Sequence, residues 1–201
     1  MKLLAISDPE FIPDEATLIN SLFREGLVCL HIRKPGSSED DFADLLTGIR
    51  PEFRTRVAIH QHHRLSEKFQ IQRLHFTEKE RKITAPEILK TLKSSSYILT
   101  TSVHDLEDLE RLPSYFSYTF FGPVFDSISK KGYKSVLPDD FYIRPEIKKR
   151  PVYGLGGISA GNVGKLGPMN FDGAAVLGTL WNEPENTIAK FCELRDLIYS
   201  S

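Results

Sequence analysis

The sequence has little excess charge, few cysteines and no long hydrophobic run, and each absence excludes a class of protein. Its 201 residues carry a net charge of −1, so no affinity for nucleic acid or for a membrane surface is predicted. The only cysteines, Cys29 and Cys192, lack the spacing of a metal or redox motif, which fits a reducing compartment. The apolar residues 3–6 are closed by Asp8 after too few residues for a signal peptide or a membrane span. We therefore expect a cytoplasmic protein whose partners are small molecules.

The chain is long enough to bury a full hydrophobic core as one domain. A length of 201 residues lies in the usual range for a single domain. No linker, internal repeat or low-complexity tract divides the sequence. We therefore expect residues 1–201 to form a single domain.

Short apolar runs alternate with segments of helical periodicity along the whole chain. The eight apolar runs predict strands at residues 3–7, 28–32, 56–59, 73–76, 98–102, 118–121, 151–153 and 173–177. The segments between them predict helices at residues 14–24, 41–49, 85–93, 105–112, 139–147 and 185–199, with weaker signals at 66–69 and 160–166. Such alternation predicts a parallel sheet, and eight units closed on themselves form a TIM (β/α)8 barrel. A doubly wound open sheet is the alternative fold.

Polar side chains follow the ends of several predicted strands. Arg33 ends the second strand, His60 the third and Ser102 the fifth. Glu80 follows the fourth strand, and His104 comes shortly after Ser102. In barrels of this type, functional residues lie where the carboxyl ends of the strands meet. These side chains are therefore candidates for one site at the mouth of the barrel.

Glycine follows three consecutive strands, and a basic turn follows the first of them. Glycine lets the oxygens of a ligand approach backbone N–H groups closely, and a lysine adds positive charge. Together with Arg33, this composition predicts a phosphate or pyrophosphate pocket. The candidate positions in these loops are Gly122, Lys130, Gly156, Gly157, Leu177 and Gly178.

Each of these features also has an explanation without a ligand. The pair Gly156 and Gly157 suits a tight turn between a strand and a helix. Lys130 suits a solvated loop, and Arg33 could close the barrel mouth by pairing with a carboxylate. Their convergence at one end of a barrel favours ligand contact.

The histidines divide into interior, loop and mouth positions. His31 and His75 occupy alternating positions inside two strands and are interpreted as hydrogen-bonded residues that help fill the barrel. The tract His60-Gln61-His62-His63 offers neighbouring imidazoles to zinc. However, adjacent loop residues point apart and no fourth ligand is evident, so a solvated loop is favoured. In this interpretation His60 alone faces the mouth.

His104 has two interpretations. It either caps the helix predicted from Asp105 or transfers a proton in the site. Ser102 and His104 do not form a nucleophile elbow, because no G-x-S-x-G turn surrounds Ser102 and no orienting acid can be named.

Four blocks of the sequence resemble, in order and spacing, the thiamin-phosphate synthase/TenI superfamily. They are His31-Ile32-Arg33-Lys34, Thr101-Ser102-Val103-His104, Gly122-Pro123-Val124-Phe125 through Lys130, and Gly156-Gly157-Ile158. The resemblance covers nearly the whole chain, and the block after the sixth strand is the most specific. It implies a TIM barrel that acts in thiamin biosynthesis on small phosphorylated substrates, and a homodimer is expected from the family.

Synthases of this family couple aminopyrimidine pyrophosphate with thiazole phosphate and release pyrophosphate. The resemblance implies that Arg33, Ser102 and Lys130 hold the pyrophosphate, and His104 is a further catalytic candidate. The loops after the seventh and eighth strands would offer backbone to the thiazole phosphate. The implied substrate- and phosphate-binding positions are His31, His60, Gly122, Gly156, Gly157, Leu177 and Gly178.

The resemblance also implies Mg²⁺, and here the sequence departs from the family. Synthases have Asn-Asp after the third strand, where this chain has His60-Gln61. They have Asp after the fourth strand, where this chain has Glu80, so Glu80 is the one implied metal ligand. The lysine that stands two residues after the arginine in synthases is replaced by Pro35, and Lys34 comes one residue early.

Two other functions fit the same resemblance. A TenI-type thiazole tautomerase moves protons without a metal and also lacks the Asn-Asp pair, and His31 and Val103-His104 resemble that branch. Its acid–base histidine directly follows the glycine after strand six, where this chain has Pro123, which cannot transfer protons. His60, His62 or His104 could substitute for it. The third function is a catalytically silent barrel that binds thiazole phosphate or thiamin phosphate.

Overall fold

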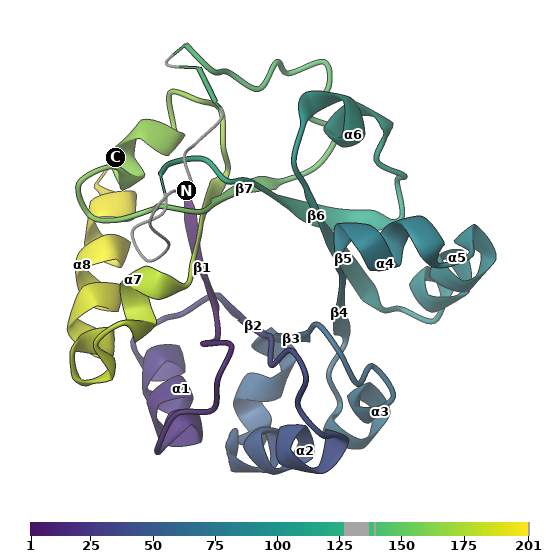
Figure 1. Ribbon diagram of the computed structural model, residues 1–201, viewed down its shortest axis with the longest axis vertical. Coiled ribbons are helices and arrows are strands. Elements are labelled where there is room, and N and C mark those ends of the chain that lie inside the picture. Colours follow the sequence, from purple (N-terminus) through teal and green to yellow (C-terminus); the bar gives the residue numbers. More distant parts are fainter. Residues whose placement is uncertain (127–136, 139, 201) are drawn as a thin grey trace.

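The computed structural model describes residues 1–126, 137–138 and 140–200. Eight parallel strands form a closed barrel in which each strand pairs with its neighbours in the sequence and β8 pairs with β1. Figure 1 looks down this barrel, with the helices around its outside. The TIM barrel is therefore confirmed, and every predicted strand overlaps an observed one. The strands are β1 (Lys2–Ile6), β2 (Cys29–Ile32), β3 (Val57–Ile59), β4 (Arg73–Phe76), β5 (Ile98–Val103), β6 (Phe116–Phe121), β7 (Val152–Leu155) and β8 (Gly173–Val176).

Most of the predicted helices are also present. The α-helices are α1 (Glu15–Arg24), α2 (Glu39–Gly48), α3 (Leu65–Phe69), α4 (Glu78–Ile83), α5 (Pro86–Ser94), α6 (Leu106–Arg111), α7 (Gly178–Trp181) and α8 (Thr187–Tyr199). Short 3₁₀ helices are η1 (Pro51–Arg56), η2 (Val163–Leu166) and η3 (Pro184–Asn186). The helix predicted at residues 160–166 is thus a 3₁₀ turn preceded by irregular backbone. No helix in the described part of the chain is long and apolar enough to cross a membrane.

Side-chain caps explain where several helices begin. Ser38 accepts a backbone N–H at the start of α2, and Asp105 does the same at the start of α6. Thr77 and Glu80 form a reciprocal capping box at the start of α4. Helix α4 was not predicted. Glu80 was expected in a loop, but it lies in the first turn of this helix.

The helix predicted at residues 139–147 is wrong. Residue 139 lies outside the described part of the chain, and residues 140–147 form irregular backbone with one turn. Pro145 has no N–H for a helical hydrogen bond and disfavours helical geometry in the residue before it. Instead, the Ile143 N–H donates to the carbonyl of Met169 at 3.1 Å. This contact ties the segment to the loop that precedes β8.

Two hydrophobic clusters hold the barrel together. The larger one lies between the strands and the surrounding helices. The smaller one fills the inside of the barrel and consists of Leu4, Ile6, Cys29, Ala58, Phe120, Tyr153 and Ala175. Because side chains alternate along a strand, the buried His31 shares the inner face of β2 with Cys29. The inside of the barrel therefore combines apolar side chains with histidine, and Ile6 lies level with His31.

Candidate functional site

A cavity of about 270 Å³ opens at the carboxyl ends of β2, β3 and β4. It brings together three of the predicted site residues, Arg33, His60 and Glu80. Its remaining lining residues are Pro35, Gly36, Ser37, Gln61, His62 and Thr77. The convergence predicted for this side of the mouth is therefore present.

Arg33 is held in place by its backbone and lines the cavity. Its N–H donates to the Ser7 hydroxyl oxygen at 2.9 Å, and that hydroxyl donates to the Arg33 carbonyl at 3.2 Å. Ser7 is fully buried at the end of β1, so these bonds fix the start of the loop after β2. Within the described residues, no ion pair joins Arg33 to a carboxylate. The carboxylate partner considered for Arg33 is therefore not found there, and the positive charge is available to an anion.

The next residue, Lys34, has the opposite environment. Its side chain is completely buried, and its ammonium group contacts both carboxylate oxygens of Glu15 at 2.7 Å. It also donates to the backbone carbonyls of Asp8 and Glu10. Lys34 is therefore a structural residue that joins the loops after β1 and β2, and it does not replace the lysine that synthases have two residues after the arginine.

Among the described residues that line the cavity, Glu80 is the only carboxylate. Its Oε2 atom accepts from the Thr77 N–H at 2.8 Å and from the Thr77 hydroxyl at 2.7 Å. The amide nitrogen of Gln61 donates to the Lys34 carbonyl. Since Mg²⁺ requires about six oxygen ligands in near-octahedral geometry, these donors do not fit a magnesium ion held by the protein alone.

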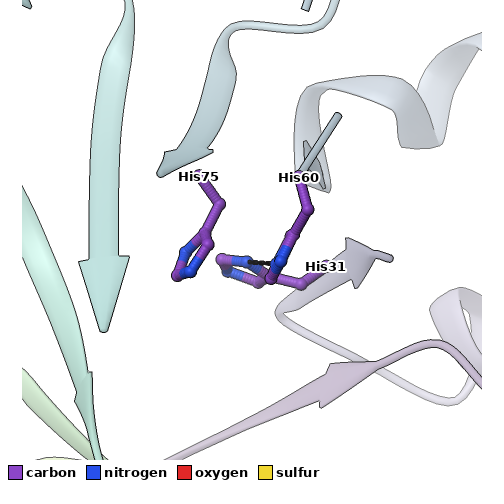
Figure 2. A group of neighbouring side chains, drawn as sticks. All are labelled: His31, His60 and His75. Carbon is purple, nitrogen blue, oxygen red and sulfur yellow. Dashed lines mark hydrogen bonds between the residues drawn. The ribbon is translucent and has the colours of Figure 1, made fainter. Parts of the chain in front are cut away.

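His60 connects the cavity to a cluster of three buried histidines. Figure 2 shows the rings of His31, His60 and His75 turned toward one another from β2, the end of β3 and β4. His31 Nδ1 lies 3.0 Å from His60 Nε2, and the rings of His60 and His75 stack with their centroids 3.9 Å apart. His31 Nε2 is 2.8 Å from the Tyr118 hydroxyl. The interior positions predicted for His31 and His75 are therefore present, but sequence analysis did not group them with His60.

Burial keeps these imidazoles neutral. Desolvation lowers the pKa of His31 and of His60 well below the usual 6.5, and the neighbouring His75 contributes to both shifts. The pKa of His75 is lowered to about 3, again mainly by burial and then by His63 and Arg33. All three rings can therefore act as acceptors or ligands at neutral pH.

The other two histidines of the loop turn to separate partners. His62 Nε2 is 3.1 Å from the Ser37 carbonyl, whereas His63 Nε2 is 3.1 Å from the His75 carbonyl. The imidazoles of His60, His62 and His63 thus diverge, as the sequence predicted for neighbours on a loop.

Ser102 and His104 lie on β5 and just after it but face different surroundings. The Ser102 hydroxyl oxygen is 3.2 Å from His75 Nε2, which places Ser102 beside the buried histidines. His104 Nδ1 donates to the Gly122 carbonyl at 2.5 Å, and its ring is half exposed. Helix α6 is capped by Asp105, so the capping role considered for His104 is wrong.

The glycines after β6 and β7 allow close contact between two loops. A Cβ atom at Gly122 would lie 2.1 Å from the Leu155 carbonyl oxygen, and one at Gly157 would lie 2.3 Å from the Asp126 carbonyl oxygen. Gly157 also has a φ of +66°, which favours glycine. The Gly156 carbonyl accepts the N–H of Phe125 at 3.1 Å. The packing between these loops therefore explains by itself why glycine is needed at positions 122 and 157, without contact to a ligand.

Leu177 and Gly178 lie beside the loop after β7. Gly178 begins α7, and Leu177 is the residue before it. The Thr179 hydroxyl donates to the Ile158 carbonyl and so joins the loops after β7 and β8. The predicted site residues thus form two groups, one around β2–β5 and one around β6–β8, while Lys130 lies outside the described residues.

The closed barrel and the polar side chains at its mouth define a (β/α)8-barrel protein with a candidate ligand site at the carboxyl ends of the strands. The family model described as thiamine monophosphate synthase matches residues 3–180. The chain belongs to this family. A comparison with curated protein sequences gives no significant match.

Solved structures agree with this assignment. Thiamine phosphate pyrophosphorylase from Bacteroides thetaiotaomicron is 25% identical with a TM-score of 0.76, and the alignment covers 99% of this chain and 98% of that one. The Pyrococcus furiosus thiamine phosphate pyrophosphorylase is 18% identical with a TM-score of 0.78, covering 99% and 96%. Tryptophan synthase subunit alpha from Legionella pneumophila is 14% identical with a TM-score of 0.67, covering 100% and 93%, and shows a shared fold alone. Family and structural similarity support a function related to thiamin.

Proposed function

We propose that this chain is a thiamin-phosphate synthase, which joins aminopyrimidine pyrophosphate to thiazole phosphate and releases pyrophosphate. The observation that carries the proposal is the guanidinium group of Arg33. It lines the mouth cavity without an ion pair among the described residues, in a chain of this family. A planar cation of this kind suits the phosphate oxygens of a leaving pyrophosphate.

The reaction requires the protein to stabilise negative charge. The bond between the pyrimidine methylene carbon and the pyrophosphate oxygen breaks, and its electron pair leaves with the pyrophosphate. The lone pair of the thiazole nitrogen then forms the new carbon–nitrogen bond, and no proton changes place in this step. Preorganised donors aimed at the leaving oxygens would therefore supply most of the rate enhancement. In our proposal these donors are Arg33, the Ser102 hydroxyl and Lys130.

The opposite side of the mouth suits the thiazole phosphate. The loops after β7 and β8 contain Gly156, Gly157, Leu177 and Gly178, and a hydrogen bond from Thr179 holds the two loops together. Backbone N–H groups at strand ends and at the start of a helix are uncharged phosphate donors. Pro123 after the glycine of strand six matches the synthases rather than the tautomerases.

Magnesium does not enter the proposed steps, because the cavity offers it one carboxylate, that of Glu80. In many enzymes Mg²⁺ is held by one or two carboxylates together with substrate phosphates. An effect of added Mg²⁺ would therefore be expected only with the pyrophosphate substrate present.

A thiazole tautomerase is the second candidate function, and one contact favours it. His104 Nδ1 donates to the Gly122 carbonyl, so an imidazole stands beside the glycine that precedes the tautomerase histidine in that branch. The Nε2 atom of the half-exposed ring lies 3.5 Å from Glu78 Oε2, so a ligand that takes a proton from this ring would have to approach beside that carboxylate. In this alternative, His104 partly replaces the acid–base histidine of the tautomerases, whose position is occupied by Pro123.

One assay tests both functions. Purified protein is mixed with both synthase substrates, with and without Mg²⁺, and thiamin phosphate is followed by its fluorescence after oxidation. Formation of thiamin phosphate above the protein-free rate supports the synthase. Absence of product from protein shown to be folded contradicts the synthase proposal. Conversion of a thiazole carboxylate phosphate by the same sample would then establish the tautomerase. Binding of thiazole phosphate or thiamin phosphate without any turnover would indicate a silent barrel.

A further inference from the structure

The three buried histidines form a cluster that the proposed reaction does not use as a unit. One nitrogen from each ring of His31, His60 and His75 lies within 4.8 Å of the nitrogens offered by the other two. The rings are at most 5% exposed and come from three consecutive strands (Figure 2). The barrel thus holds them on or directly after separate strands, with one nitrogen of each ring close to those of the other two.

The surroundings of His75 leave one of its nitrogens free of hydrogen. The Thr100 hydroxyl donates to the Leu74 carbonyl at 3.5 Å, so its oxygen is free to accept from His75 Nδ1–H at 2.9 Å. That tautomer leaves His75 Nε2 with a bare lone pair facing the cluster and Ser102.

His31 has a similar arrangement on the other side of the cluster. Its Nε2 can donate to the Tyr118 oxygen at 2.8 Å, while the phenol hydroxyl points toward Cys29 Sγ at 3.7 Å. His31 Nδ1 then has a bare lone pair, 3.0 Å from His60 Nε2. A histidine that ligates a metal commonly donates its other N–H to a neighbouring oxygen, which fixes the ring and its tautomer. Thr100 and Tyr118 stand in these positions.

His60 has one nitrogen without a partner. Its Nδ1 atom is buried, and no described residue forms a hydrogen bond with it. An ion bound through Nε2, the nitrogen that faces His31, would place the proton of the neutral ring on Nδ1. Ligation through Nε2 would therefore fix the tautomer of His60 without supplying a partner for Nδ1.

We propose that His31, His60 and His75 form a binding site for a divalent transition-metal ion of the Zn²⁺ type, at the inner end of the mouth cavity. Two nitrogens about 2.0–2.1 Å from one tetrahedral ion lie roughly 3.4 Å apart. The 3.0 Å between His31 Nδ1 and His60 Nε2 is close to that spacing, whereas the ring of His75, which stacks on that of His60, would have to turn to bring its Nε2 to the same ion. A water molecule would occupy the fourth position.

The chemistry of the donors selects the class of ion. Neutral imidazoles favour Zn²⁺, Co²⁺, Ni²⁺ and Cu²⁺, whereas Mg²⁺ and Ca²⁺ favour oxygen ligands. The lowered pKa values of the three rings keep them deprotonated at neutral pH, as ligation requires. This site is distinct from the magnesium position at Glu80 that the family resemblance implies.

The test measures metal binding by the full chain, independently of any catalytic activity. Protein treated with a chelator is titrated with Zn²⁺ by calorimetry and with Co²⁺ by visible absorption. We expect one Zn²⁺ per chain and the intense bands of four-coordinate Co²⁺. The variants His60→Gln and His75→Gln should each weaken Zn²⁺ binding by about 100-fold or more, and Thr100→Val by about 10- to 100-fold.

The control variant His62→Gln removes an imidazole from the same loop without touching the cluster, and it should bind Zn²⁺ like the wild type. Circular dichroism checks that each variant is folded. The proposal is overturned if wild-type protein binds no Zn²⁺, if the Co²⁺ spectrum is that of a six-coordinate ion, or if His62→Gln weakens binding as much as His60→Gln. The Co²⁺ spectrum of the wild-type protein tests the proposal without any variant. A variant that fails to fold therefore does not leave the proposal untested.

Discussion

Arg33 and Lys34 are adjacent cations with opposite roles, and the difference arises from what packs around each. Arg33 lines the mouth cavity, whereas Lys34 is fully buried against Glu15. The position of Arg33 could be predicted because it follows an apolar strand. The burial of Lys34 could not, because its partner comes from a helix that precedes β2 in the chain and meets it only after the barrel closes.

Replacing Arg33 tests the proposed pyrophosphate contact. Arg33→Ala should lower kcat/KM for thiamin-phosphate formation by about 10- to 150-fold, the equivalent of about 1.5–3 kcal/mol for hydrogen bonds to a charged group. Arg33→Lys should retain part of the activity, because it keeps the charge and loses the planar fork. Arg64→Ala is the control, since Arg64 is exposed and pairs with Glu39. Equal losses in Arg33→Ala and Arg64→Ala would contradict the contact.

Replacing His104 tests the alternative function, the thiazole tautomerase. If the chain has tautomerase activity, His104→Gln should lower its rate by about 10²- to 10⁴-fold, because a glutamine cannot exchange the proton. The rate is measured on thiazole carboxylate phosphate, with Arg64→Ala as the control because Arg64 is exposed and pairs with Glu39. Retention of full tautomerase activity by His104→Gln would remove His104 from that mechanism.

At the scale of elements, local sequence signals explain one helix that was not predicted and one predicted helix that is absent. The pattern Thr77-x-x-Glu80 is a capping box that predicts the start of α4, but Glu80 was interpreted only as a site candidate. The helix expected at residues 139–147 failed for a related reason, because Pro145 and the bond from Ile143 to Met169 outweigh the apolar periodicity. Glu80 therefore has a structural role that weakens its assignment as a metal ligand.

The buried pair of Lys34 and Glu15 links the loop after β2 to α1. Lys34→Met should lower the free energy of unfolding by about 3–5 kcal/mol, because the Glu15 carboxylate is left buried without a cation. Burial already raises the pKa of Glu15 above its usual value, even with Lys34 beside it. Urea denaturation measures the change.

Two further variants check this explanation. Lys82→Met removes an exposed pair with Glu78 and should change stability by no more than about 1 kcal/mol. The double variant Lys34→Met/Glu15→Leu should recover much of the loss, since neither charge then remains buried. A loss as large in the double variant as in Lys34→Met would show that the cost lies in packing instead.

At the scale of the whole molecule, the alternation of apolar runs and helical segments was enough to predict the barrel, because that pattern suits few architectures. The histidine network inside it could not be predicted. His31 and His75 were placed on inner faces, but the contact with His60 depends on the stagger of β2, β3 and β4. That stagger is seen only in the pairing of His31 with Ala58 and of Ala58 with Arg73.

The buried histidines make the stability of the barrel depend on pH. Their pKa values are lowered in the folded chain, and that of His75 falls to about 3 from 6.5. Below pH 6.5 the unfolded chain binds protons that the folded chain does not, so stability falls as the pH decreases. The slope approaches about 1.4 kcal/mol per pH unit for each such histidine.

Urea midpoints measured without metal between pH 7.5 and 5 should therefore decrease, and His75→Gln should show a shallower decrease than wild type. His62→Gln should follow the wild-type slope. A stability that is constant over this range would contradict the neutral, buried state of the cluster.

The most direct test of the central claim is a single-turnover reaction with enzyme in excess over aminopyrimidine pyrophosphate. Thiamin phosphate and released pyrophosphate are measured in the same quenched samples. The account predicts that both appear together, one for one, only when thiazole phosphate is present, and much more slowly with Arg33→Ala. Pyrophosphate release without thiamin phosphate, or neither product from folded protein, would contradict it.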